Sequence, residues 1–218
     1  LDNEESIIMT SKSKTGITED ERDVRHAEKM AKKKAARDKI VATKTIEKGL
    51  LIVHTGKGKG KSTAAMGLAV RAIGNGMKVG IVQFVKGVWE TGERVVLDKF
   101  PELCVIKAMG EGFSWETQDR RRDIQAAENA WRMAKDMMDD ESFDLIILDE
   151  LNIPLRYDNL DIDDVVKTLH NKRPMLHVVV TGRNAKDPLL EAADLVTEMT
   201  MVKHPFRAGV KAQKGIEF

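Results

Sequence analysis

The sequence predicts an α/β fold in which a mainly parallel sheet carries helices on both faces, preceded by a helical arm. From Leu50 onward, short apolar runs alternate with amphipathic segments, which is typical of βαβ units. The apolar runs are continuous in Val, Ile and Leu, as strands buried on both faces require. Residues 1–48 lack this alternation and are rich in charge. We therefore expect an N-terminal charged, partly helical arm (1–48) and an α/β domain (49–218).

Strands and helices are expected to alternate along the domain. Its predicted strands are residues 50–54, 78–84, 103–107, 144–148, 175–181 and 193–199. The first predicted helix, 61–73, stops at the glycine-rich segment 74–76. The longest, 117–139, has apolar residues at spacings of three and four, which place Trp131 on a core-facing stripe. A shorter helix, 161–171, opens with acidic residues that suit its N-terminal dipole.

The arm contains a predicted helix over residues 19–39 that is dominated by charge. Its second half is basic, and its apolar residues form only a thin stripe at helical spacing. Such a segment is compatible with a solvated tail as well as with a helix that docks on a partner, and its residues alone do not choose between the two.

Composition excludes several classes of protein. The 218 residues are 42% hydrophobic and 33% charged, as expected for a soluble globular protein. The 36 basic residues almost balance the 35 acidic ones, which gives no reason to expect a nucleic-acid partner. No stretch approaches the ~20 apolar residues of a membrane span. The single cysteine, Cys104, excludes an internal disulfide framework, so we expect a cytoplasmic protein.

A glycine- and lysine-rich segment between the first strand and the first helix predicts a phosphate-binding loop, or P-loop. Glycines let backbone N–H groups approach phosphate oxygens, and the following helix directs its positive end at the same anion. Lys61 would add a cation for the phosphate oxygens, and Ser62 a hydroxyl for Mg²⁺. The predicted nucleotide-binding residues are Thr55, Gly56, Lys57, Gly58, Lys59, Gly60, Lys61, Ser62 and Thr63.

The loop departs from the usual G-x-x-x-x-G-K-[ST] pattern because its first residue is Thr55 rather than glycine. A glycine-rich turn without a ligand is the competing interpretation. Gly-Lys-Ser, the flanking strand and the flanking helix coincide, however, and three lysines in one loop would repel one another without an anion between them. The P-loop indicates a P-loop NTPase-like (RecA-like) version of the α/β fold.

Two carboxylates that follow the fourth predicted strand form the second half of this site. Asp149 and Glu150 end an apolar run, as the residues on the Mg²⁺ side of a P-loop do. Acidic residues often follow strands, but the P-loop ~90 residues earlier strengthens the interpretation. We predict Ser62, Asp149 and Glu150 as metal ligands and Glu150 also as a nucleotide contact. This local chemistry leaves a RecA-like ATPase, a small-molecule kinase and a non-enzymatic ATP-binding regulator open.

Further motifs follow in a fixed order along the chain. They are Val82–Gly87, Gly92-Glu93-Arg94, Gly112–Thr117, Val180–Arg183, Val202–Phe206 and Gly209–Phe218. This ordered set resembles the P-loop type of ATP:cob(I)alamin (ATP:corrinoid) adenosyltransferase over roughly residues 49–218. The resemblance includes that family's altered loop, T-G-x-G-K-G-K-[ST]-T, so Thr55 matches the family pattern.

The resemblance implies an enzyme that moves the 5′-deoxyadenosyl group of ATP onto the cobalt of reduced cob(I)alamin or a related corrinoid and releases triphosphate. The nucleophile is the cobalt itself, so no protein base is required. The protein must hold the 5′-carbon over the cobalt and stabilise the departing triphosphate, for which Lys61 and Mg²⁺ are suited. ATP, Mg²⁺ and a corrinoid are thus the implied ligands.

The family resemblance also assigns roles to individual residues. Phe113 and Trp115 correspond to aromatic residues that displace the lower axial ligand of cobalt(II), which makes the metal easier to reduce. Without the resemblance, both would be taken for ordinary core aromatics. Arg71, nearly three turns after Lys61 on the same helix, corresponds to an arginine near the nucleotide. A homodimer, an electron donor such as a reduced flavoprotein, and an arm that caps the corrinoid site are implied as well.

Overall fold

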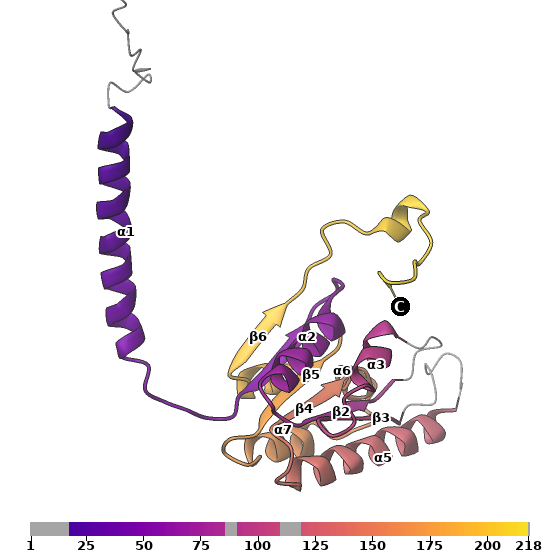
Figure 1. The fold of residues 1–218 in the computed structure, drawn as a ribbon. Coiled ribbons are helices and arrows are strands. Elements are labelled where there is room, and N and C mark those ends of the chain that lie inside the picture. Colours follow the sequence, from indigo (N-terminus) through magenta and orange to yellow (C-terminus); the bar gives the residue numbers. More distant parts are fainter. Residues whose placement is uncertain (1–17, 86–90, 110–118, 218) are drawn as a thin grey trace, which may run out of the picture. The chain divides into compact units, whose positions relative to one another are not determined.

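The computed structural model describes residues 18–85, 91–109 and 119–217, and the chain divides into two compact units, Leu1–Glu47 and Lys48–Phe218 (Figure 1). In the first unit, helix α1 (Glu19–Ala42) begins at a capping box. The Thr18 hydroxyl accepts the Glu21 N–H, and the Glu21 carboxylate accepts the Thr18 N–H. No residue of α1 is buried. The predicted arm helix is therefore present, three residues longer than expected at its C-terminal end.

The second unit is built on a six-stranded sheet with the order β3-β2-β4-β5-β1-β6, in which every strand pair is parallel. This confirms the predicted α/β class. The strands are β1 (Leu51–Thr55), β2 (Val79–Gln83), β3 (Cys104–Ala108), β4 (Leu145–Asp149), β5 (His177–Thr181) and β6 (Leu195–Glu198). Each lies within or one residue beyond a predicted segment.

Helices cover both faces of the sheet, as Figure 1 shows. The predicted helices are α2 (Lys61–Gly74), α5 (Arg120–Asp139) and α7 (Ile162–His170). The expected first residues of α5, from 117, lie outside the described part of the chain. Four short elements were not predicted because each is too short to show a periodic pattern: α3 (Gly92–Leu97), α6 (Asn152–Arg156), α8 (Asp187–Ala192) and the 3₁₀ helix η1 (Pro205–Ala208).

Alternate residues of the inner strands enter two separate cores. Leu51 and Val53 belong to a first core with residues of α5, α7 and α8, whereas Ile52 belongs to a second core with residues of α2 and α3. Trp131 lies in the first core as expected, and its indole N–H donates a hydrogen bond of 2.8 Å to Asp164. Each helix among the described residues is too short or too polar to cross a lipid bilayer.

The strand order brings the predicted P-loop and the predicted acidic pair to one edge. Because the strands are parallel, the carboxyl ends of β1, β4 and β5 meet there, with β5 between the other two. The P-loop follows β1, the acidic pair ends β4, and Gly182 and Arg183 follow β5. In open α/β sheets, this edge is where ligands bind.

Candidate active site

The P-loop has the backbone conformation that an anion site requires. Gly56 and Gly60 have φ angles of 97° and 102°, values that residues with a side chain rarely adopt. Gly60 is the N-cap of α2, and no side chain of the described residues caps the first N–H groups of that helix. These N–H groups and the helix dipole therefore remain available for a phosphate.

The loop packs closely against the segment that follows β6. The Gly58 N–H donates to the Met199 carbonyl oxygen at 2.6 Å, and the Met199 N–H donates to the Thr55 carbonyl oxygen at 2.9 Å. A Cβ atom on Gly58 would lie 2.6 Å from the Thr200 carbonyl oxygen. Glycine is therefore required at position 58 because another backbone passes beside it.

Thr55 has a structural reason to replace the usual glycine. It ends β1, is buried, and its hydroxyl accepts the Ala185 N–H at 3.1 Å. That hydrogen bond joins the start of the P-loop to the loop that follows β5. A glycine here would leave the Ala185 N–H without this acceptor.

Lys61 lies inside the loop rather than in solvent. Its side chain is only 6% exposed, and its amine donates to the Gly58 carbonyl oxygen at 2.5 Å. Burial lowers the pKa of Lys61, Glu150 opposes that shift, and the nearby Arg183 and Lys59 lower the pKa further. An added anion would relieve this repulsion among cations.

Thr181 joins the acidic pair to β5. It is fully buried, its hydroxyl donates to Asp149 Oδ1 at 2.8 Å, and the Thr181 hydroxyl oxygen accepts the Glu150 N–H at 2.9 Å. The other Asp149 oxygen accepts a hydrogen bond of 3.4 Å from the amide of Gln83. Glu150 itself has a φ of 61°, an uncommon value for a residue with a side chain. The carboxylates are thus held by a specific local arrangement rather than solvated at a strand end.

The Glu150 carboxyl is electrostatically coupled to the P-loop. Burial raises its pKa, the neighbouring Asp149 raises it further, and Lys61 and Arg183 act in the opposite direction. Arg183 directly follows Gly182, which lies against the Glu150 side chain, so it is near the candidate site although it was not among the predicted site residues. Its signal was available in the sequence, since the Val180–Arg183 motif ends β5 at the same edge.

Gly182 forms the turn between the end of β5 and Arg183. Its φ is 128°, and a Cβ atom there would lie 2.8 Å from Asn152 Cβ and 3.2 Å from Glu150 Oε2. The amide of Asn152 donates to the Gly182 carbonyl oxygen at 2.9 Å. The ends of β4 and β5 are therefore packed too closely for a larger residue at position 182.

Comparison with known protein families shows which family the chain belongs to. The sequence profile of the ATP:corrinoid adenosyltransferase BtuR/CobO/CobP family matches residues 47–218. The chain belongs to this family. A second profile, Cob(I)alamin adenosyltransferase N terminal, matches residues 15–41, which include most of α1. The resemblance seen in the sequence motifs is thereby confirmed, and it extends to the arm.

Individual relatives of this family cover nearly the whole chain. A corrinoid adenosyltransferase of Sinorhizobium sp is 59% identical over 90% of this chain and 92% of its own length. A corrinoid adenosyltransferase of Pseudomonas aeruginosa is 52% identical over 91% of this chain and 98% of its own length. One of Escherichia coli K12 is 44% identical over 90% of this chain and 99% of its own length. The solved flagellar accessory protein FlaH of Methanocaldococcus jannaschii has a TM-score of 0.44 and 18% identity over 72% and 73% of the two chains, too remote for any inference.

The structure does not bring every residue implied by the ATP:corrinoid adenosyltransferase resemblance to the site. Arg71 is exposed on the last turn of α2, about 15 Å of helix rise from Lys61. Its nucleotide contact stays a prediction. Phe113 and Trp115 lie outside the described residues, so their corrinoid contacts stay predictions as well.

The remaining predicted residues surround the P-loop. Ser62 is half-buried on the first turn of α2, whereas Lys57 and Thr63 are exposed. Lys59 forms an ion pair with Glu217 near the C-terminal end of the chain. Three histidines have structural contacts. His54 lies 3.4 Å from the Lys61 carbonyl oxygen, His177 accepts the Leu50 N–H, and His204 caps η1.

Proposed function

We propose that this chain transfers the 5′-deoxyadenosyl group of ATP to the cobalt of a reduced corrinoid and releases triphosphate. The proposal rests on one observation above all. A chain of the ATP:corrinoid adenosyltransferase family has a P-loop with uncapped helix N–H groups and a buried lysine. In the proposed reaction, the cobalt(I) electron pair forms the bond to the 5′-carbon. The bond from that carbon to the phosphate oxygen breaks, and its electron pair leaves with triphosphate.

The residues of this chain would act on the leaving group. Lys59 and Arg183 lie close enough to Lys61 to lower its pKa, and an anion among these cations is favoured for that reason. The N–H groups at the start of α2 would bind phosphate oxygens without reorganising, because Gly56 and Gly60 already hold the loop open. The proposed reaction requires no general base, since the nucleophile is the cobalt of the substrate.

The donor set suits Mg²⁺, whose preferred ligands are oxygens. The Ser62 hydroxyl and the Asp149 and Glu150 carboxylates would hold the ion together with phosphate oxygens. When bound, Mg²⁺ would neutralise part of the triphosphate charge. The hydrogen bond from Thr181 orients the Asp149 carboxylate.

The competing functions predict different products. A RecA-like ATPase would release orthophosphate, and a small-molecule kinase would produce ADP and a phosphorylated acceptor. We expect only triphosphate when the protein is incubated anaerobically with ATP, Mg²⁺ and chemically reduced cobalamin, together with the absorbance change of a cobalt–carbon bond. Orthophosphate or ADP as the main product would refute the proposal.

We propose further that the enzyme is a cytoplasmic homodimer that receives electrons from a reduced flavoprotein. In this proposal, α1 caps the corrinoid site, which is consistent with the family profile over residues 15–41 and with the absence of buried residues on α1. Deletion of residues 1–40 should weaken corrinoid binding more than ATP binding. If both affinities are unchanged in titrations, α1 has no capping role. Sedimentation analysis would test the dimer independently.

A further inference from the structure

The C-terminal segment, residues 199–217, begins and ends on the P-loop; we call it the tail. At its start, the Met199 backbone exchanges hydrogen bonds with Gly58 and Thr55. At its end, the Glu217 carboxylate pairs with the Lys59 amine. These nineteen residues thus form a closed strap over one loop, since positions 199 and 217 both contact it. Figure 1 shows this strap, in yellow, beyond β6.

The tail has no core of its own to hold it in place. None of its described side chains is buried, and three large apolar ones are strongly exposed: Val202, Phe206 and Ile216. The hydrophobic effect therefore contributes little to its position. Its attachment depends on the polar contacts at its two ends, and contacts of that kind respond to a charged ligand.

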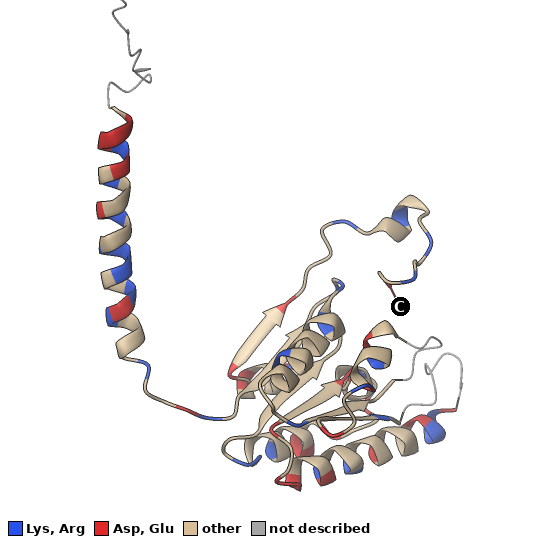
Figure 2. Ribbon diagram, in the orientation of Figure 1, with Lys and Arg blue, Asp and Glu red and all other residues tan. Residues whose placement is uncertain are grey.

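The charge of the tail fits an anion. Its four basic residues, Lys203, Arg207, Lys211 and Lys214, are all exposed, and Glu217 is its only acidic residue. Four positive charges and one negative charge leave a net charge of +3. Figure 2 shows the blue basic positions distributed along the strap. The P-loop adds Lys57, Lys59 and Lys61 on the other side.

We propose that the tail forms the second wall of the polyphosphate site. Until the polyphosphate binds, the Glu217 carboxylate pairs with the Lys59 amine in the place that a phosphate oxygen then takes. This inference rests on the proposed function and names residues that determine its specificity for a triphosphate. A carboxylate and a phosphate oxygen are both anionic acceptors for the same ammonium group. Polyphosphate binding releases Glu217 from Lys59, and the tail lysines then face the terminal phosphates.

Two substitutions in the tail have opposite expected effects. Glu217→Gln removes the competing carboxylate, so inorganic triphosphate should bind about 1.5-fold to fivefold more tightly, which is the range for an exposed ion pair. A combined Lys211→Gln and Lys214→Gln variant should bind it several-fold more weakly and with a smaller dependence on salt concentration. Titration calorimetry with Mg²⁺ and inorganic triphosphate, without corrinoid, measures both affinities.

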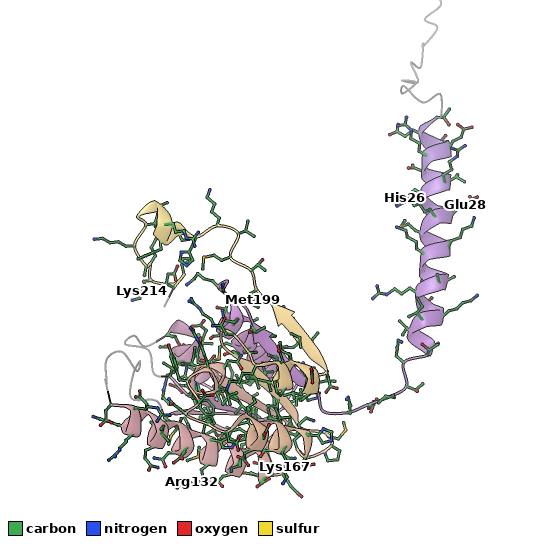
Figure 3. The ribbon with its side chains drawn as sticks, turned by 180° about the vertical axis from the view of Figure 1, so that it is seen from behind. His26, Glu28, Arg132, Lys167, Met199 and Lys214 are labelled. Atoms are coloured by element: carbon green, nitrogen blue, oxygen red, sulfur yellow. The ribbon has the colours of Figure 1, made fainter. Side chains whose placement is uncertain are left out.

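Matched variants separate this mechanism from a general change in charge. Lys167→Gln, on the last turn of α7, should bind triphosphate as the wild type does; Figure 3 shows Lys167 far from Met199 and Lys214. In a Lys59→Gln background, Glu217→Gln should not change the affinity for triphosphate any further, because the amine with which the Glu217 carboxylate pairs is absent. A Glu217→Gln effect that persists there would overturn the pairing mechanism.

The outcomes also distinguish this inference from the proposed function. If the wild type transfers the adenosyl group and binds triphosphate, but both tail variants bind triphosphate as tightly as the wild type, the tail inference alone is wrong. If the wild type binds no triphosphate at all, both fail. Tightening by Glu217→Gln together with weakening by the lysine variant supports the tail as a wall of the site.

Discussion

The Thr181 hydroxyl donates a hydrogen bond of 2.8 Å to Asp149, and both side chains are buried. The same hydroxyl oxygen accepts the N–H of Glu150, the residue with a φ of 61°. One small polar side chain on β5 therefore binds both the Asp149 carboxylate and the Glu150 backbone at the end of β4. An apolar residue of the same shape could not replace it without leaving two buried polar groups unpaired.

Thr181→Val should therefore destabilise the protein by about 2–4 kcal/mol, because a buried acceptor and a buried donor each lose a partner. Thr181→Ser keeps the hydroxyl and loses only a methyl group, so its cost should be about 1 kcal/mol. Chemical denaturation measures both values. A Thr181→Val protein at least as stable as the Thr181→Ser protein would contradict the role assigned to the hydroxyl.

Stability should depend on pH through Glu150. Its folded-state pKa is raised above the ordinary value of 4.5, mainly by burial, so the folded protein holds this proton more tightly than the unfolded chain does. The free energy of unfolding should fall as the pH rises from about 4.5 through the raised pKa. Glu150→Gln should remove that fall.

The exposed Glu102, which lies before β3 at the opposite edge of the sheet, supplies the control for this experiment. Urea titrations at a series of pH values should give Glu102→Gln the same profile as the wild type. A Glu150→Gln profile that also matches the wild type would mean that another group causes the pH dependence.

Lys61→Ala should reduce turnover at least about 100-fold, because one preorganised cation at a developing negative charge contributes on that scale. Lys167→Ala, at the other end of the domain, should leave turnover unchanged. Rates measured from pre-reduced cobalamin isolate this step from cobalt reduction. A Lys61→Ala enzyme with nearly wild-type turnover would mean that the amine does not stabilise the leaving group.

Thr55→Gly would give the P-loop its more common first residue, yet it should destabilise this chain by about 1–2 kcal/mol. The Ala185 N–H would lose its acceptor, and glycine lowers the stability of a strand. Thr55→Ser should retain most of the stability because its hydroxyl can accept the same bond. Thermal unfolding of the three proteins gives the ranking, and a Thr55→Gly protein as stable as the wild type would contradict it.

Phe113→Ala and Trp115→Ala should impair the reaction that starts from cobalt(II) and spare the reaction from pre-reduced cobalt(I). This follows from the role that the family resemblance implies, in which the two aromatic side chains displace the lower axial ligand before reduction. Parallel assays from the two oxidation states provide the measurement. Losses of the same size in both assays would argue against ligand displacement.

Much of the fold was predictable because its signals are local. Runs such as 144–148 predicted buried strands, and Gly60, Lys61 and Ser62 predicted a phosphate loop at a strand–helix junction. The short helices α3, α6 and α8 were missed because five or six residues do not complete two helical turns. Their positions depend on packing against the sheet.

The sequence by itself determined the family, the α/β class and the chemical character of the site, because glycine, lysine and carboxylate positions carry those properties wherever they occur. Only the tertiary structure decided which distant residues meet. Strand order brought Arg183 to the same edge of the sheet as Lys61 and Glu150 and gave Thr55 its partner Ala185. The path of the tail brought Glu217 to Lys59. Such pairings depend on strand order and on the path of the chain beyond the sheet, and no local pattern of side chains encodes either.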